Sequence, residues 1–427
     1  MRTIIINKCY SSCVNYIHDI RELGFEPVLL EPYVENEEQR KAVRKDYEEN
    51  YKLNGDVIPA VITEKESYEK TLGMIRAIDP VLILPGCDNG IRMALRLSED
   101  LGLVSNSYGN YLKMRDKYYM QKALEEAGVD HIPTVILNTI DDALEFFRSQ
   151  NGNPVVLKPT ESSATAGVHI CFSPEQVSDA YEKICSLING RGNGDELLIG
   201  QPYVQGEEYA WDTVSCAGSH VALYGWKYAK RLIPGCGTVY DRTFYISPDD
   251  AEYKDLVDYV FKVLDVLGIK YGAVHTEVIK TAGGPVLVEV NCRPGGGEQR
   301  YSYQDLIMQE HETMVALHSY LMAPAEFLSR YPVRMHLKQF AAIKDICLKQ
   351  DIFVKKAKID EACRDLKSYV YSINPGDNRM YLKTTELCLR GGSVFFAGSD
   401  KDLVLKDLDY FTNLEEEHID RLYDLEV

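Results

Sequence analysis

The 427-residue sequence lacks any apolar run long enough to cross a lipid bilayer. Its longest apolar runs have the size of residues 81–84, whereas a membrane-spanning helix needs about 20 residues. The apolar start of the chain ends at Asn7 and Lys8, which makes it too short for a secretory signal. These absences predict a cytoplasmic protein without a membrane partner.

Cysteine is present, but not in the patterns that bind zinc or build disulfide scaffolds. The eleven cysteines are scattered and odd in number, unlike the dense, even set of a small secreted domain. Only Cys9 and Cys13 are close in sequence, and no Cys-x-x-Cys or His-x-x-x-His spacing supports a zinc site. We expect mostly reduced thiols.

Positive charge is in deficit. The chain has 47 Lys and Arg residues against 65 Asp and Glu residues, a formal net charge of −18. Such a surface repels nucleic-acid phosphates, so we expect no nucleic-acid partner. The glycine-rich strings of a Walker loop and of a dinucleotide-binding turn are also absent, which argues against both of these nucleotide sites.

What is present fits a folded chain of several domains, with 45% hydrophobic and 26% charged residues. Strand-like and helix-like patterns alternate over the first quarter of the chain, which predicts a parallel sheet covered by helices on both faces. The expected strands are 3–7, 27–30 and 81–84, and the expected helices are 12–23, 36–51, 67–78 and one ending at Leu101.

Beyond this region the pattern changes to α+β. A single helix is expected over 111–128 and another over 251–267. Strand-like runs lie at 154–172, 197–204, 209–216, 220–230, 272–280 and 286–292, and residues 333–427 are again rich in strand-like runs.

The segment 271–293 carries the most chemical information. Two alternating runs surround a Gly-Gly turn, which predicts a β-hairpin. A three-residue loop at 282–284 places Glu277 directly opposite Glu289. Opposed carboxylates repel each other, so we expect a cation to neutralise them.

Side-chain alternation along the second strand places Leu287, Asn291 and Arg293 on the face of Glu289. Two carboxylates and the Asn291 amide oxygen form an all-oxygen set that suits Mg²⁺ or Mn²⁺. Arg293 is then placed to hold a phosphoryl oxygen. The alternative is a solvent-facing hairpin with its acids in water and Arg293 screening one of them.

Two further segments fit a nucleotide site. Lys158 ends a strand that leads into a loop of small hydroxyl residues, 160–167; such a loop lets backbone N–H groups approach phosphates. In 197–208 a Gln-Pro-Tyr-Val link precedes an acidic pair, an arrangement that can contact a purine and a ribose. An ordinary hairpin turn and an interdomain connector are the respective alternatives.

In this order and spacing, the segments resemble the ATP-grasp superfamily over residues 1–322. Residues 288–296 resemble its Glu-x-Asn-x-Arg signature. Residues 207–215 and 226–230, together with 275–277, are most similar to the L-amino acid ligases that make dipeptides.

The resemblance implies an ATP-grasp fold in three units. These are an N-terminal Rossmann-like domain at 1–107, an ATP-grasp region at 108–322 with a lid subdomain at about 129–203, and a strand-rich α+β domain at 323–427.

The resemblance also implies roles for individual residues. The lid, the adenine hinge and the ribose carboxylate complete an ATP site with two lysines. Its residues are Lys117, Lys158, Ser162, Ser163, Gly167, Gln201, Pro202, Tyr203, Val204 and Glu208. Glu277, Glu289 and Asn291 would bind Mg²⁺ or Mn²⁺, Arg293 and His275 would be catalytic, and Arg300 and Gly296 would contact substrate.

Some of these assignments have alternatives or depart from the family. His275 also fits a structural histidine, and Arg300 an ordinary surface ion pair. The lid has a single glycine where many relatives have several, and Gln201 replaces a frequent Glu, although its amide oxygen can still accept a bond from the adenine amino group.

The implied activity is that of an ATP-dependent carboxylate–amine ligase. It would join two small molecules, a carboxylate donor and an amine acceptor that the resemblance implies to be amino acids, through an acylphosphate and release ADP and phosphate. The alternatives are a biotin-carboxylase-like or D-alanine-ligase-like enzyme and a nucleotide-binding regulator without turnover. A homodimer is compatible with the sequence.

Overall fold

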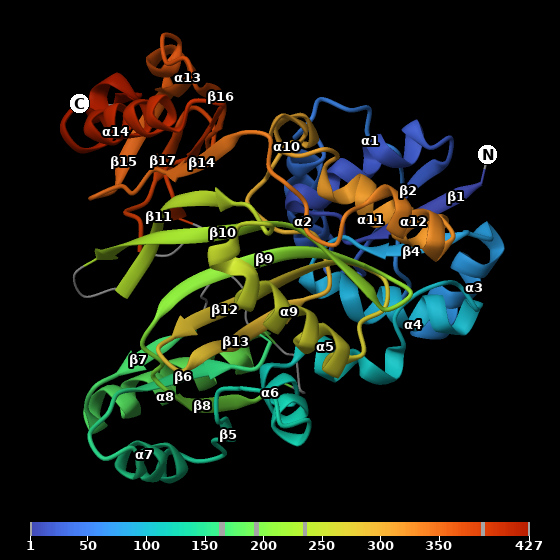
Figure 1. Ribbon diagram of the computed structural model, residues 1–427, viewed down its shortest axis with the longest axis horizontal. Helices are drawn as coiled ribbons and strands as arrows, with labels where there is room; N and C mark the ends of the chain where they lie inside the picture. The colour runs from blue at the N-terminus through green and yellow to red at the C-terminus, as the bar shows by residue number, and fades with distance from the viewer. Residues whose placement is uncertain (1, 162–166, 192–195, 234–236, 386–388, 426–427) are drawn as a thin grey trace.

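The computed structural model describes residues 2–161, 167–191, 196–233, 237–385 and 389–425 (Figure 1). The N-terminal region forms a parallel sheet in the order β3-β2-β1-β4. Its strands are β1 (Thr3–Asn7), β2 (Glu26–Glu31), β3 (Ala60–Thr63) and β4 (Leu82–Pro85), and its helices are α1 (Asn15–Glu22), α2 (Glu37–Asn50), α3 (Tyr68–Ile78) and α4 (Ile91–Leu101).

Both faces of this sheet are covered, as the unbroken apolar run of β1 predicts. Ile4 and Ile6 pack into one hydrophobic cluster and Ile5 into another. All three side chains are fully buried. The expected parallel α/β arrangement is confirmed.

The single helix expected over 111–128 is wrong. The structure has two helices, α5 (Tyr111–Arg115) and α6 (Lys117–Glu126). Asp116 between them has extended backbone, and its side chain accepts hydrogen bonds from the N–H groups of Tyr118 and Tyr119. Asp116 therefore starts a new helix as its N-cap, which the high helix propensity of its neighbours conceals in the sequence.

A small antiparallel sheet, ordered β5-β8-β6-β7, follows at the bottom of Figure 1. Two helices pack on it through a separate hydrophobic cluster. The elements are β5 (Val135–Ile136), α7 (Ile140–Ser149), β6 (Val155–Pro159), β7 (His169–Cys171), α8 (Pro174–Arg191) and β8 (Leu198–Pro202).

The largest sheet has eight antiparallel strands in the order β13-β12-β9-β10-β11-β14-β18-β16. Its first half consists of β9 (Glu207–Cys216), β10 (Ser219–Ile233), β11 (Gly237–Ile246), β12 (Gly272–Thr281) and β13 (Gly284–Asn291). Helix α9 (Lys254–Leu267) packs with α6 against β9, β12 and β13. The opposite face of β9 and β10 packs against α1, α10 (Tyr301–Ile307), α11 (Glu312–Leu321) and α12 (Pro324–Arg330).

The C-terminal strands continue this large sheet, because β14 pairs with β11. The elements are β14 (Phe340–Asp345), β15 (Ile352–Ala357), α13 (Ile359–Cys363), β16 (Tyr369–Ile373), β17 (Arg379–Tyr381), β18 (Ser393–Gly398), α14 (Lys401–Glu417) and β19 (Tyr423–Leu425). A three-stranded sheet, β17-β15-β19, lies beside them. A boundary at residue 323 stays a prediction.

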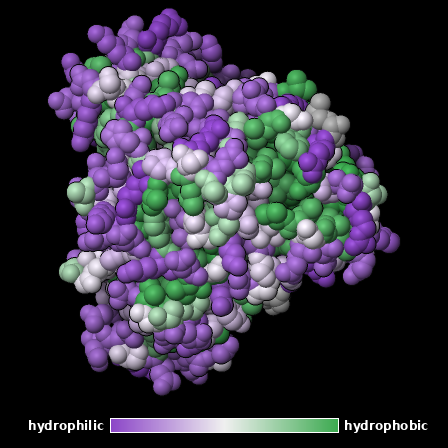
Figure 2. Space-filling model, turned by 45° about the vertical axis from the view of Figure 1, so that its right-hand side comes forward, coloured by the Kyte–Doolittle hydropathy of each residue, from purple (hydrophilic) through white to green (hydrophobic). Residues whose placement is uncertain are grey.

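The surface is mostly hydrophilic on the face drawn in Figure 2, with hydrophobic residues gathered on its right-hand side and, in smaller groups, left of its centre. None of the helices in the described ranges combines the length and the apolarity that crossing a membrane requires.

Candidate active site

The hairpin of β12 and β13 sets two carboxylates against each other. Glu277 is paired with Glu289 in the strand register, so the predicted opposition is confirmed. The route to it differs from the prediction. Thr281 faces Gly284, so the loop is one residue shorter than predicted. A β-bulge between the Glu277–Glu289 pair and the Val278–Leu287 pair restores the register.

The bulge also moves one side chain to the other face. Leu287 packs in the same hydrophobic cluster as Val290 and Cys292, beneath α9 and α6, and not on the face of Glu289 as simple alternation predicts. An extra residue in one strand reverses the orientation of the residues on one side of it. The apolar side chain is thereby buried while the two acids stay together.

Two lysines approach this pair from different parts of the chain. Lys117 lies at the start of α6, and its Nζ is 2.6 Å from Glu289 Oε2. Its backbone N–H donates to the carbonyl of Thr160, which follows the strand of Lys158. Burial and the nearby Lys117 charge lower the pKa of Lys158 to about 8. Lys158 forms no ion pair with any described residue.

The pKa values of the two glutamates are shifted in opposite directions. Burial and the Glu289 charge raise the pKa of Glu277. Burial also acts to raise the pKa of Glu289, but Lys117, an N–H of Asn291 at 2.8 Å and Lys158 together lower it to about 2. Glu289 is therefore a firmly ionised carboxylate, and Glu277 lacks comparable compensation.

His275 lies between two acids. Its Nδ1 is 2.9 Å from Asp212 Oδ1, and its Nε2 is 3.5 Å from Glu277 Oε1. Burial lowers the pKa of His275, but Asp212 and Glu277 outweigh this effect and raise it to about 10. The imidazole is thus charged at neutral pH, which suits it to orienting Glu277 and not to accepting a proton.

Arg293 reaches the N-terminal region. Its Nε and Nη2 lie 2.9 and 3.1 Å from the two oxygens of Asp88. Asp88 precedes α4, so this bidentate pair joins the end of the hairpin to the edge of the parallel sheet. Burial opposes both charges, yet the pair lowers the pKa of Asp88 and raises that of Arg293.

After Arg293 the chain makes a close turn at 295–297. A Cβ on Gly295 would lie 2.7 Å from Asp212 Oδ1, so only glycine fits there. The N–H of Gly295 donates to the Glu312 carboxyl group, and the carbonyl of Gly296 accepts from Ser12 Oγ at 3.1 Å. The turn is held from both sides.

Comparisons with known proteins show which family this part of the chain matches. Residues 151–301 match the family model described as an ATP-grasp domain. The chain contains an ATP-grasp domain. This match, together with the similarity of the chain to a synthase and a ligase, confirms the expected ATP-grasp ligase class.

Two relatives and one solved structure show the extent of the similarity. Dapdiamide A synthase of Enterobacter agglomerans is 28% identical over 326 residues, which cover 76% of this chain and 70% of the relative. The L-arginine-specific L-amino acid ligase of Bacillus subtilis is 24% identical over 200 residues, 46% of this chain and 47% of that relative. The crystal structure of an L-amino acid ligase from Bacillus licheniformis has a TM-score of 0.75 with 14% identity and 98% of each chain covered, and it confirms the fold.

The remaining ATP-site predictions lie around the small sheet of the ATP-grasp domain. Gln201 is buried on β8 and donates through Nε2 to Thr134 Oγ1 at 2.7 Å. This hydrogen bond uses the amide nitrogen of Gln201 and not its amide oxygen. Pro202 ends β8, and Tyr203 and Val204 follow it, with Tyr203 exposed.

The predicted ribose carboxylate and the predicted lid are the other two parts of the ATP site. Glu208 at the start of β9 is bound by Lys230 at 2.6 Å and by the Tyr240 hydroxyl at 3.2 Å. Ser162 and Ser163 lie outside the described residues, and Gly167 has a left-handed φ of +77°.

Enzymes with an ATP-grasp fold bind ATP, generally with a divalent ion. The donor set of Glu277, Glu289 and Asn291 fits such an ion, because the two carboxylates face each other and repel, and all three side chains offer oxygen ligands. The sequence indicates the same three residues. The identity of the metal stays a prediction.

Four residues that contact this site are not predicted as site residues by the sequence. Asp88, Asp212, Glu312 and Tyr371 contact Arg293, His275, Gly295 and Arg300, respectively. Asp212 lies within the family-like segment 207–215, but its position opposite His275 follows only from the pairing of β9 with β12. The others carry no sequence signal of their own.

Proposed function

We propose that this protein is an ATP-dependent ligase that joins a carboxylate to an amine, both carried by amino acids, and forms a dipeptide or a similar amide. One observation carries the proposal. Glu277 and Glu289 face each other beside Lys117 and Lys158, and Arg293 closes the same end of the hairpin. Such a set neutralises a triphosphate and the charge that develops during phosphoryl transfer.

ATP is placed between the small sheet and the hairpin in this proposal. Lys117 and Lys158 bind phosphate oxygens, under the loop that contains Ser162, Ser163 and Gly167. The hinge from Gln201 to Val204 holds adenine, and Glu208 exchanges its bonds with Lys230 and Tyr240 for ribose hydroxyls. Each of these assignments follows the family resemblance.

Glu277, Glu289 and Asn291 would hold Mg²⁺ or Mn²⁺, which supplies charge neutralisation for the triphosphate. The chain's own residues do the rest. His275, held by Asp212, orients Glu277. Arg293 can leave Asp88 for a phosphoryl oxygen, because an arginine fork binds carboxylate and phosphate in the same bidentate geometry.

The chemistry follows in two steps. An oxygen of the donor carboxylate attacks the γ-phosphorus, the bond to the β,γ-bridging oxygen breaks, and ADP leaves. The amine nitrogen then attacks the acyl carbon, phosphate leaves, and the nitrogen loses a proton to solvent or to the departing phosphate. Lys117, Lys158 and Arg293 stabilise the phosphoryl oxygens in both steps.

The test is a phosphate-release screen over pairs of amino acids, followed by mass measurement of the products. We expect one or more pairs to release phosphate and to give a product of the summed mass less one water. Glu289→Ala should abolish this activity without unfolding the protein. Glu182→Ala, on the exposed face of α8, is the matched control and should retain activity.

Other results would contradict the proposal. Phosphate release with bicarbonate or with D-amino acids alone would indicate a different ATP-grasp reaction. Binding of ATP without release of phosphate for any pair would indicate a regulator. Wild-type turnover in Glu289→Ala would show that the assignment of the metal ligands is wrong.

A further inference from the structure

Arg300 is an arginine without an acidic partner in a strongly acidic protein. The chain has a net charge of −18, yet no described carboxylate forms an ion pair with Arg300. Its Nε is shielded from solvent and has no hydrogen-bond partner. A buried donor on a charged group is costly to leave unsatisfied, so this guanidinium is suited to an anionic ligand. Arg293, by contrast, is paired bidentately with Asp88.

A tyrosine from the C-terminal region fixes the orientation of Arg300. The guanidinium carbon lies 4.5 Å from the centre of the Tyr371 ring. The Tyr371 hydroxyl accepts the backbone N–H of Arg300 at 3.1 Å and donates to the carbonyl of Glu298 at 3.3 Å. Tyr371 is itself buried and stacks on Phe395 with ring centres 4.1 Å apart. One face of the guanidinium is therefore fixed, while its N–H donors have no hydrogen-bond partner among the described residues and can bind a ligand.

The turn that carries Arg300 is strained and is held from outside. Glu298 has a left-handed φ of +55°, which an ordinary side chain adopts only when its surroundings impose it. Arg390 Nη2 lies 2.8 Å from Glu298 Oε2, and Ser11 Oγ accepts the Glu298 N–H at 3.1 Å. Glu298 is thus contacted by Ser11, Arg390 and the Tyr371 hydroxyl, and the last two residues belong to the C-terminal region.

We infer that the C-terminal region completes the acceptor site: Arg300 binds the free carboxylate of the amine substrate, and Tyr371 and Arg390 are positioning residues that hold it there. The inference rests on the proposed ligase function and specifies its second substrate. That substrate is an α-amino acid or peptide with an unmodified carboxylate, and not ammonia or a simple amine.

Charge and position favour the acceptor over the donor. The donor carboxylate must reach the γ-phosphate, beside Lys117, Lys158 and Glu289. The acceptor also brings a carboxylate, which must be bound away from the phosphates so that it does not compete for phosphorylation. Arg300 is separated from the hairpin by the 295–297 turn and contacts β16 instead.

The test compares two acceptors, an amino acid and its carboxamide, with the same donor and ATP. For the wild type we expect kcat/KM to be about 10- to 100-fold higher for the free acid, which is the effect of one charge-assisted contact. Arg300→Gln should reduce this ratio to about 1 to 3 while the KM for ATP stays unchanged.

The positioning role has its own readout. Tyr371→Leu should raise the KM for the free acid by about tenfold with kcat, the carboxamide KM and the ATP KM unchanged. Tyr371→Phe keeps the ring under the guanidinium and should have a smaller effect. Denaturant unfolding of each variant separates a loss of fold from a loss of positioning.

The outcomes are distinguishable. A wild-type protein that releases no phosphate with any amino-acid pair would overturn the proposed function and this inference together. A wild type that ligates but treats acid and carboxamide alike would overturn the inference alone. So would an Arg300→Gln variant that loses both activities equally, or folded Tyr371 variants with an unchanged KM for the acid.

Discussion

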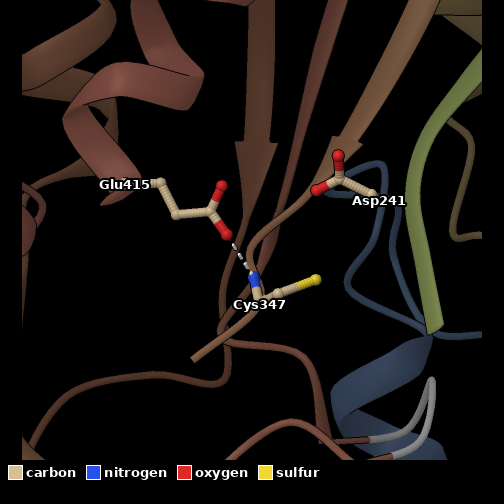
Figure 3. Close-up of side chains that lie close together, drawn as sticks. All are labelled: Asp241, Cys347 and Glu415. Carbon is tan, nitrogen blue, oxygen red and sulfur yellow. Dashed lines mark hydrogen bonds between the residues drawn. The ribbon is translucent and has the colours of Figure 1, made fainter. Parts of the chain in front are cut away.

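Two groups of charged side chains, each built partly on the large sheet, differ in how their charges are balanced. The hairpin site contains Glu277, Glu289, Lys117, Lys158 and Arg293. The second group, which we call the β11–α14 cluster, contains Asp241, Lys344, Cys347, Glu415 and Arg231 and is drawn in part in Figure 3. Both groups combine carboxylates with a buried lysine.

In the β11–α14 cluster every charge has a direct partner. Lys344 Nζ contacts Glu415 and lies 2.9 Å from Asp241. Arg231 lies 2.7 Å from Asp241 and 3.4 Å from Glu415. Glu415 of α14 also accepts the backbone N–H of Cys347 at 2.7 Å (Figure 3). This cluster attaches the C-terminal helix to the sheet.

In the hairpin site the balance is incomplete. Lys158 has no described partner, and its pKa is lowered to about 8 by burial and by Lys117. Glu277 has a raised pKa for the corresponding reason. Buried charges that are incompletely balanced are expected where a ligand supplies the missing charge. Charge pairing, and not the number of charged residues, therefore distinguishes the binding site from the structural contact.

The largest expected effect comes from breaking the balanced cluster. Lys344→Met leaves Asp241 and Glu415 buried with one cation between them, so the free energy of unfolding should fall by about 3–5 kcal/mol in a denaturant titration. Lys367→Met, at an exposed position, is the matched control and should change it by less than about 0.5 kcal/mol. An equal change in both variants would contradict the assigned role of the cluster.

The same substitution in the hairpin site should have the opposite profile. Lys158→Met removes a buried charge that has no ion-pair partner among the described residues, so the free energy of unfolding should stay within about 1 kcal/mol of the wild type. The kcat/KM for ATP should fall by about 10²- to 10³-fold, because a group that stabilises the transferring phosphate is lost. Normal turnover, or unfolding as severe as that of Lys344→Met, would reverse the distinction between the two groups.

Much of this architecture is predictable from local pattern. The apolar run of β1 predicts a covered parallel sheet, and alternation in β12 and β13 predicts the hairpin and the opposition of Glu277 to Glu289. The bulge is different, because it depends on the burial of Leu287 beneath α9, which alternation alone does not reveal. The N-cap at Asp116 is likewise decided by one side chain within a strong helix-forming segment.

The partners of the site residues are not predictable in this way. Asp88 and Arg293 are 205 positions apart, and Tyr371 and Arg300 are 71 apart. A pair across such distances is fixed by the packing of whole sheets and helices. A single sequence therefore shows which residues have suitable chemistry, and the fold decides which of them meet.

A smaller effect is expected from pH. Lys158 binds phosphate as an ammonium ion, and its pKa in the ligand-free protein is about 8. Below this pH the group is charged, and above it the neutral amine predominates, so the KM for ATP should rise with pH by up to about tenfold per unit above pH 8. Lys158→Arg should move this rise beyond the accessible range, since arginine stays charged. A KM for ATP that is flat to pH 10 in the wild type would contradict the position given to Lys158.

The smallest expected effect is an absence of metal binding at the β11–α14 cluster. Asp241, Cys347 and Glu415 present ligand atoms within 4.8 Å of one another, a group that resembles a metal site. Lys344 already supplies its positive charge, and burial raises the pKa of Cys347 to about 12, which disfavours the thiolate that a metal requires. Zinc should therefore leave the thermal midpoint unchanged in a Glu277→Gln, Glu289→Gln variant, in which the hairpin site no longer contributes.

The lysine itself provides the control for that measurement. In the same background, Lys344→Met removes the ammonium and leaves the carboxylates and the thiol facing one another, so zinc should now raise the midpoint of the destabilised variant. Binding to the folded state at 100 times the dissociation constant would stabilise it by about 2.7 kcal/mol. A rise in midpoint while Lys344 is present would mean that the cluster binds metal in the native protein, and the contrast between a closed group of charges and an open one would then fail.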